Sequence, residues 1–126
     1  MTSLTRIRCD PKDGVPTELV KEYYTQRAGA GMILTEASAW TQRGHGFPGA
    51  GNLYTQEQAE GWRKVVDAVH AKGSRIYVQL IHCGRTTSPV VTGMEVWGPS
   101  AVPIRGKTYY GTDYAVPKEM TIEDIK

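Results

Sequence analysis

Residues 55–81, TQEQAEGWRKVVDAVHAKGSRIYVQLI, predict a helix followed closely by a strand. Thr55 and Gln58 have the spacing of a capping box, in which each side chain bonds the backbone N–H of the other at a helix start. A stripe of apolar side chains follows at helical spacing, namely Trp62, Val65, Val66 and Val69. Gly73 ends this helix. The short apolar run 76–81 then predicts a strand buried on both faces.

The residues before this stretch predict another helix and another strand. Thr17 can cap a helix, and Gly29 and Gly31 end it. The run 32–37 is short and mostly apolar without alternation, which again indicates a strand buried on both faces. Residues 4–7 precede the first helix and indicate the end of an earlier strand.

A strand, a helix and a second strand at this spacing make a βαβ unit, whose two strands are parallel. The chain therefore predicts an α/β fold with three consecutive β units. Residues 82–120 are irregular and punctuated by glycine and proline, and Thr121 begins a last helix. A (β/α)₈ barrel typically needs about 250 residues, whereas this chain has 126. We expect an incomplete architecture whose sheet edges lack partners.

The composition is that of an ordinary globular domain. Apolar residues make up 40% and charged residues 22% of the chain. The net charge is +2 and the basic residues are scattered, which gives no electrostatic footprint for nucleic acid or a membrane surface. No apolar run reaches the ~20 residues of a membrane span, and the N-terminus lacks the apolar core of a signal peptide. We therefore expect a cytoplasmic protein without nucleic-acid or membrane partners.

The cysteines and histidines predict no metal site. Cys9 and Cys83 form no disulfide framework, and both are expected to be reduced thiols in the cytosol. His82 beside Cys83 suggests a nucleophile or a metal ligand, but no third ligand has a recognisable spacing. His45 lies in a glycine-rich loop, and His70 lies late in a helix, where positive charge suits the helix dipole.

Polar side chains stand at the carboxyl ends of the predicted strands, where sites gather in parallel α/β proteins. Thr5 lies near the end of the first strand, Glu36 and Ala37 end the second, and Gln79 and His82 end the third. A hydroxyl and an amide offer donors and acceptors without charge, so they can bind a flat heterocycle. The residues alone leave two structural alternatives open. Thr5 is also compatible with a helix cap or a surface group, and Gln79 with a buried amide bonded within the protein.

A series of short motifs runs along the whole chain, most weakly between residues 86 and 115. The motifs are LTR (4–6), VPT (15–17), EYYTQRA (22–28), TEA (35–37), GWRKVV (61–66), VH (69–70), QLIHCGR (79–85) and VPKEMT (116–121). In this order they resemble the N-terminal part of the old yellow enzyme family. The resemblance implies a parallel (β/α)₈ TIM barrel that binds FMN. Residues 1–126 would be a single partial domain with about the first three β/α units.

The resemblance also implies roles for individual residues. Cofactor contacts are implied for Ser3, Leu4, Thr5, Ala37 and Gln79, and places in the substrate pocket for Phe47 and Ile81. Thr5 would bond the flavin O4 and tune its potential, and Gln79 would meet the pyrimidine edge. Ser3 stands where the family usually has proline, and Ile81 stands where it often has tryptophan, which would widen the pocket. No catalytic residue is implied within the chain, because the family's substrate-anchoring and proton-donating residues fall beyond Lys126.

The function implied is that of an FMN-dependent oxidoreductase with NADPH as reductant. In this class, hydride passes from reduced FMN to the C=C bond of an α,β-unsaturated carbonyl or related electrophile. We expect the 126-residue chain to be inactive alone and to need the remaining segments of the barrel. The alternative is a truncated, non-enzymatic paralogue that acts as an interaction module or has no function. A phosphate-binding barrel of aldolase type is less favoured, because no lysine stands at a strand end.

Overall fold

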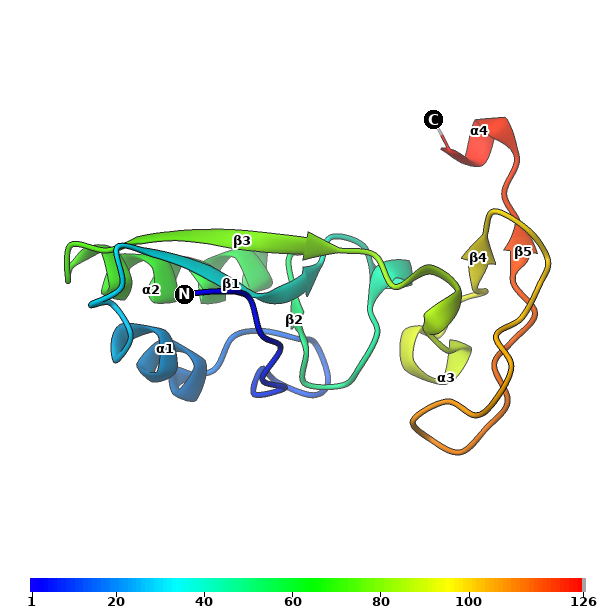
Figure 1. Cartoon of the computed structure of the whole chain (residues 1–126), viewed down its shortest axis with the longest axis horizontal. Helices are drawn as coiled ribbons and strands as arrows, with labels where there is room; N and C mark the ends of the chain where they lie inside the picture. Colours follow the sequence, from blue (N-terminus) through cyan, green and yellow to red (C-terminus); the bar gives the residue numbers. More distant parts are fainter. Residues whose placement is uncertain (126) are drawn as a thin grey trace.

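The structure is a computed structural model that describes residues 1–125. Its first part contains α1 (Glu18–Thr25), β1 (Met32–Ala39), β2 (Gly51–Asn52), α2 (Gln56–His70) and β3 (Arg75–Ile81). Its second part contains α3 (Pro89–Thr92), β4 (Trp97–Gly98), β5 (Lys118–Glu119) and α4 (Ile122–Ile125). Two 3₁₀ turns, η1 (Gln42–Gly44) and η2 (Gly84–Thr86), lie between these elements. Figure 1 shows β4, β5 and α4 beyond the carboxyl end of β3, well apart from α1 and α2.

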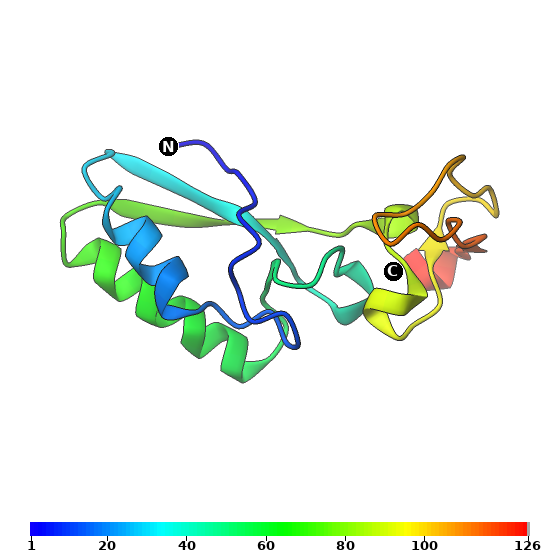
Figure 2. The same ribbon diagram turned by 90° about the horizontal axis from the view of Figure 1, so that it is seen from below.

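A parallel sheet in the order β2-β1-β3 forms the centre of the first part. The register pairs Ile33 with Ile76 and, after an irregularity, Ala37 with Gln79. Helices α1 and α2 lie on the same face of this sheet, as the two views in Figures 1 and 2 show. The predicted βαβ unit is therefore confirmed, with β1 and β3 parallel and α2 between them along the chain.

Local capping chemistry starts both long helices where the sequence predicts. The Thr55 hydroxyl accepts the N–H of Gln58, and the Gln58 side chain accepts the N–H of Thr55 at 3.0 Å, so the capping box is present. Thr17 accepts the N–H of Val20 and caps α1. Each cap satisfies backbone donors that a helix start otherwise leaves unpaired. The caps fix where each helix starts, and its buried apolar side chains form the side that faces the sheet.

Replacing Thr55 with alanine is expected to lower the free energy of unfolding by about 1 kcal/mol, because one cap hydrogen bond is lost. Urea titration followed by far-UV circular dichroism measures this change. Gln56→Ala serves as the control, since Gln56 is exposed in the first turn of α2 and its side chain donates to the exposed Glu60 and takes no part in the cap. Equal effects of the two substitutions would contradict a stabilising cap at Thr55.

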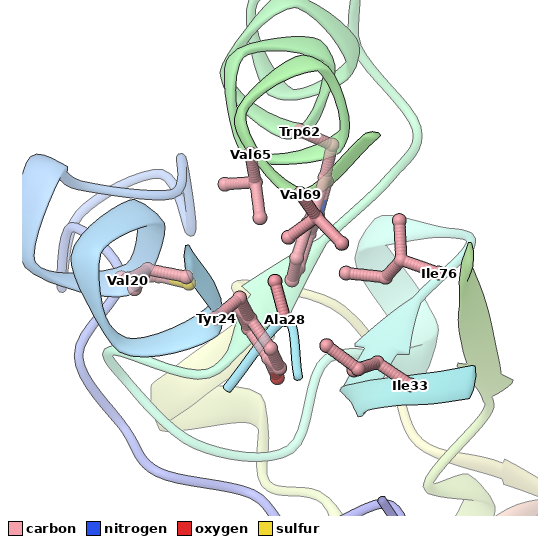
Figure 3. Packing of buried hydrophobic residues seen from close by; sticks show 9 residues of the cluster. Val20, Tyr24, Ala28, Ile33, Trp62, Val65, Val69 and Ile76 are labelled. Carbon is pink, nitrogen blue, oxygen red and sulfur yellow. The ribbon is translucent and has the colours of Figure 1, made fainter. Parts of the chain in front are cut away.

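The core lies between the two helices and the sheet. Figure 3 shows apolar side chains from α1, α2, β1 and β3 meeting there. The buried members are Cys9, Val20, Tyr24, Ala28, Ile33, Trp62, Val65, Val69 and Ile76. The Trp62 indole also donates to the backbone oxygen of Asn52 at 3.1 Å, which ties α2 to β2. Through this core, helices α1 and α2 pack against β1 and β3 and hold the two strands in place.

The prediction that residues 76–81 are buried on both faces was wrong. Only Ile76 of β3 is buried, and Tyr77 and Leu80 are 52% and 54% exposed. The reason is topological, because β3 is an edge strand of this sheet and both helices cover the same face. The corresponding prediction for β1 was sound, since β1 is central and most of its side chains are buried. β1 also extends to Ala39, beyond the predicted end at residue 37.

The prediction of a strand over residues 4–7 was wrong as well. This segment is irregular, and Ile7 has a φ of 54°, which no extended strand accommodates. Backbone pairing with β1 occurs earlier, where Leu34 N–H donates to the oxygen of Met1 at 3.0 Å. The terminal ammonium of Met1 donates to the oxygen of Met32.

Residues 82–120 contain more order than the sequence indicated. Two-residue strands β4 and β5 pair in parallel, with Trp97 opposite Lys118. Strands this short leave no periodic pattern to detect. The last helix begins as predicted, because Thr121 and Asp124 bond each other's backbone N–H groups at 2.9 and 3.2 Å. Within residues 1–125, no helix is long and apolar enough to cross a lipid bilayer.

Candidate functional site

Residues singled out from the sequence meet at the carboxyl ends of β1 and β3. Thr5, Ala37, Phe47 and Ile81 line one small cavity of about 40 Å³. They come from the N-terminal segment, from β1, from the loop after η1 and from β3. The carboxyl ends of neighbouring parallel strands share one edge of a sheet, which explains why residues distant in sequence converge here. The structure therefore brings together four of the seven predicted site residues around one cavity.

Gln79 joins this group through its neighbours. It stands opposite Ala37 in the register of β1 and β3. Its side-chain oxygen accepts the Ser3 hydroxyl at 2.6 Å, and its backbone N–H donates to the Thr35 hydroxyl at 3.2 Å. Ser3 is thereby placed beside Gln79. Leu4 is different, because its side chain is 57% exposed and does not line the cavity.

The donor set of this site suits the edge of a flat, neutral ring. Within residues 1–125, neither the Thr5 hydroxyl nor the Gln79 side-chain nitrogen has a hydrogen-bond partner. Both side chains are exposed, and Ala37 between them is small. One hydroxyl and one amide can therefore meet alternating donors and acceptors on a heterocycle such as a flavin. Among residues 1–125, no arginine or lysine lines the cavity, so the described part of its wall has no cationic group to select a negatively charged ligand.

His45 and Cys83 are among the further residues that line the cavity, and the sequence assigned neither of them to it. His45 Nδ1 lies 2.7 Å from the Asn52 side-chain oxygen, and burial lowers the pKa of His45, which favours the neutral imidazole. Burial raises the pKa of Cys83, which keeps it a thiol. Gly46 is needed beside it, because a Cβ at Gly46 would lie 2.5 Å from the Cys83 sulfur.

No signal in the sequence located His45 in this wall. It arrives there through a glycine-rich loop, and the Thr87 hydroxyl, far along the chain, holds its backbone oxygen. Cys83 could have been found, because it follows β3 within the QLIHCGR motif at a strand end. Within residues 1–125, no group of three or more His, Cys, Asp or Glu side chains is placed to hold a metal ion.

A second, larger hollow of about 580 Å³ lies where the two parts of the chain meet. Its wall includes Trp40 and Arg43 near η1, His82 after β3, Trp97 of β4 and Met120. The Arg43 guanidinium lies 4.0 Å from the centre of the Trp97 ring and contributes a cation–π contact. The sequence analysis singled out only His82 among these residues, because the wall is assembled from segments that are far apart in the chain.

The pattern of the whole chain is that of a known family. A model of the NADH:flavin oxidoreductase / NADH oxidase family matches residues 1–126. The chain belongs to this family. The family is flavin-dependent by its description, which agrees with a site built from neutral hydrogen-bonding groups.

Other members of the NADH:flavin oxidoreductase family are similar along nearly the whole chain. A flavin oxidoreductase of Emericella nidulans is 44% identical over 97% of this chain and 33% of its own length. A probable flavin mononucleotide-dependent alkene reductase of Leishmania infantum is 40% identical over 99% of this chain and 37% of its own length. The solved old yellow enzyme homologue of Zymomonas mobilis is 41% identical, with a TM-score of 0.90 over 99% of this chain and 36% of that one.

This chain thus spans about a third of the length of the family members it matches. The predicted resemblance to the old yellow enzymes and the predicted barrel class are both confirmed. The fold is a partial (β/α)₈ barrel, in which the parallel strands β1 and β3 and the helix between them form a βαβ unit. The roles of individual residues in this chain stay predictions.

Proposed function

We propose that this chain supplies the flavin-edge part of an FMN-dependent oxidoreductase of the ene-reductase class. The whole reaction would transfer hydride from reduced FMN to the activated C=C bond of an α,β-unsaturated carbonyl or related electrophile. NADPH would reduce the flavin. The chain would act together with the remaining segments of one barrel domain, in the cytoplasm, where its two free cysteines stay reduced.

The observation that carries the proposal is the convergence of Thr5, Ala37 and Gln79. Ala37 and Gln79 are neighbours across β1 and β3, and Thr5 lines a cavity with Ala37. The two polar side chains have free hydrogen-bonding groups in the described part of the chain. No helix of that part covers the sheet face opposite α1 and α2 (Figure 2). This is the arrangement expected for groups that hold the edge of a planar ring.

Each residue would have a defined task toward FMN, which supplies the hydride chemistry when bound. The Thr5 hydroxyl would donate to the flavin O4, and the Gln79 amide would bond the pyrimidine edge. Ser3 would orient the Gln79 amide through its 2.6 Å hydrogen bond. Backbone groups of Ser3, Leu4 and Ala37 would approach the ring. Phe47 and Ile81 would border the substrate, since both side chains line the cavity beside Thr5.

A second candidate function is favoured by the exposed face of β3. A chain that spans about a third of its relatives and presents Tyr77, Leu80 and Ile81 to solvent could bind another protein without catalysing a reaction. The two functions differ in what they require of Thr5 and Gln79. An interaction module needs the apolar face of β3 only, whereas a flavin site needs the two polar groups.

A chimera tests the proposed function. This chain would replace the matching third of the Zymomonas mobilis old yellow enzyme homologue. We expect the purified chimera to hold FMN, shown by its absorbance, and to oxidise NADPH with cyclohexenone as acceptor. A folded chimera without flavin would overturn the proposal and favour the non-enzymatic alternative.

In this chimera, Thr5→Ala is expected to lower the flavin reduction potential by about 30–60 mV. A hydrogen bond to a charged group contributes about 1.5–3 kcal/mol, and about 30 mV corresponds to 1.4 kcal/mol for a two-electron couple. Potentiometry with a redox dye measures the shift. Thr2→Ala is the matched control, because Thr2 is an exposed threonine of the same segment outside the cavity. An unchanged potential in Thr5→Ala would exclude Thr5 from the flavin contacts.

A further inference from the structure

Glu36 is a buried acid that no flavin contact explains. It lies on β1 directly before Ala37 and is 1% exposed. One carboxyl oxygen, Oε2, accepts the backbone N–H of Arg6 at 3.0 Å. The other oxygen, Oε1, is buried without a partner in the described part of the chain. Burying a carboxyl group with incomplete partners is unfavourable, and burial raises its pKa, so a glutamate at this place calls for a structural reason.

The backbone that Glu36 holds is strained. Ile7 directly follows Arg6 and has a φ of 54°. A β-branched residue adopts this left-handed conformation only where its surroundings impose it. After Ile7 in the chain, the backbone is held by a second close contact. The Cys9 N–H donates to the backbone oxygen of Gly49 at 3.0 Å. A Cβ on Gly49 would lie 2.9 Å from the Ile7 side chain, so only glycine permits this approach.

The bond from Arg6 to Glu36 is an amide–carboxyl contact and not an ion pair. Among residues 1–125, no lysine or arginine nitrogen lies within 4.0 Å of the Glu36 carboxyl oxygens. The residue packed against Glu36 from α1 is Tyr24, whose hydroxyl oxygen accepts the Glu36 backbone N–H at 2.6 Å. Tyr24 therefore fixes the backbone of Glu36, and Glu36 fixes the backbone of Arg6.

The side chains of Glu36 and Ala37 lie in different surroundings. Glu36 lines a hollow together with Val20 of α1, whereas Ala37 lines the cavity in which Thr5 is also found. Thr5 in turn directly precedes Arg6. We propose that Glu36 is a positioning residue, which holds Thr5 beside Ala37 by accepting the Arg6 amide. This inference rests on the proposed function, since it gives Glu36 its purpose through the flavin-edge role of Thr5.

The first test needs no flavin. The chimera, prepared without flavin so that β3 has its neighbouring strands, would be labelled with ¹⁵N and with ¹³C-methyl threonine, so that one sample reports the Arg6 amide and the Thr5 methyl group. In the unaltered chimera, the Arg6 amide should be protected from hydrogen exchange, like the Cys9 amide bonded to Gly49. Glu36→Met, which fills the site without an acceptor, should speed Arg6 exchange roughly tenfold or more and shift the Thr5 methyl resonance. Glu36→Gln keeps an acceptor and should restore both readings.

Several outcomes would overturn the proposal. One is an unprotected Arg6 amide in the unaltered chimera, a reading that does not depend on whether any variant folds. Another is a Thr5 methyl resonance that stays in place when Arg6 loses its protection in Glu36→Met. Glu22→Met is the matched control, because Glu22 is an exposed glutamate of α1, and it should change neither reading.

The second test uses the flavin-containing chimera and a double-mutant cycle. If Glu36 acts through Thr5, then Glu36→Met lowers the potential in the presence of Thr5 and adds nothing when Thr5→Ala is already present. Equal shifts in both backgrounds would contradict positioning through Thr5. A chimera that folds without flavin would sink the proposed function alone, because the exchange and methyl measurements would still decide the role of Glu36.

Discussion

The purified 126-residue chain is expected to sediment as oligomers or larger aggregates. Its edge strand β3 presents Tyr77, Val78, Leu80 and Ile81 to solvent, all at least 38% exposed. No helix of the described chain covers the face of the sheet opposite α1 and α2 (Figure 2). An exposed apolar face beside an unpaired strand edge favours association with other chains. Sedimentation velocity across a range of concentrations measures the oligomeric state.

A charge on the edge strand β3 should reverse the association. Leu80→Lys is expected to shift the chain toward monomer, because burying the lysine ammonium against another chain is unfavourable. Val90→Lys is the matched control, since Val90 is 71% exposed but lies on α3, outside β3. A compact monomer of the unaltered chain would contradict this expectation. Equal effects of the two lysines would show that β3 is not the associating surface.

The chain alone is also expected to lack NADPH oxidase and enone reductase activity and to bind FMN weakly. The cavity offers neutral groups for the ring edge, and no arginine or lysine of the described chain lines it to receive the phosphate. Phosphate sites of such barrels are formed by loops near strands seven and eight, whereas this chain supplies the parallel strands β1, β2 and β3. The contacts to the flavin ring would therefore have to hold FMN without any contact to its phosphate, which is the most strongly charged group of the ligand.

Fluorescence titration with FMN and a steady-state assay with NADPH and cyclohexenone measure these two properties. Submicromolar FMN binding, or turnover by the chain alone, would contradict the expectation. The positive control is complementation in trans. The remaining segments of the Zymomonas mobilis homologue, added to this chain, should raise its solubility and restore some flavin binding, because β3 then finds neighbouring strands.

The parts of the fold that the sequence predicted correctly are those that depend on local chemistry. The caps at Thr17, Thr55 and Thr121 each require a hydroxyl and a backbone N–H only three residues away, so neighbours in sequence decide them. The burial of β3 depends on which other strands and helices are present. An apolar run in the sequence shows that the residues are hydrophobic, but it does not show which other elements cover them in the fold.

The candidate site was predictable to the extent that it follows from parallel strands. Ala37 and Gln79 end adjacent strands, so their proximity follows from the βαβ topology alone. Thr5 reaches them for a different reason, which involves a left-handed Ile7 that no sequence pattern indicates. The position of His45 depends on a hydrogen bond from Thr87 across a long separation in sequence. Contacts of this kind are decided by tertiary packing rather than by local preference.

The distribution of the three tryptophans gives the molecule built-in optical reporters. Trp62 is buried between α2 and the sheet, where its indole bonds Asn52. Trp40 and Trp97 lie instead in the wall of the large hollow, toward β4 and α4. The fluorescence emission of Trp62 therefore reports unfolding of the α1–α2 layer. The emission of Trp40 and Trp97 reports unfolding at the junction with the C-terminal part. Single-tryptophan variants would show whether the two parts of the chain melt as one cooperative unit or in sequence.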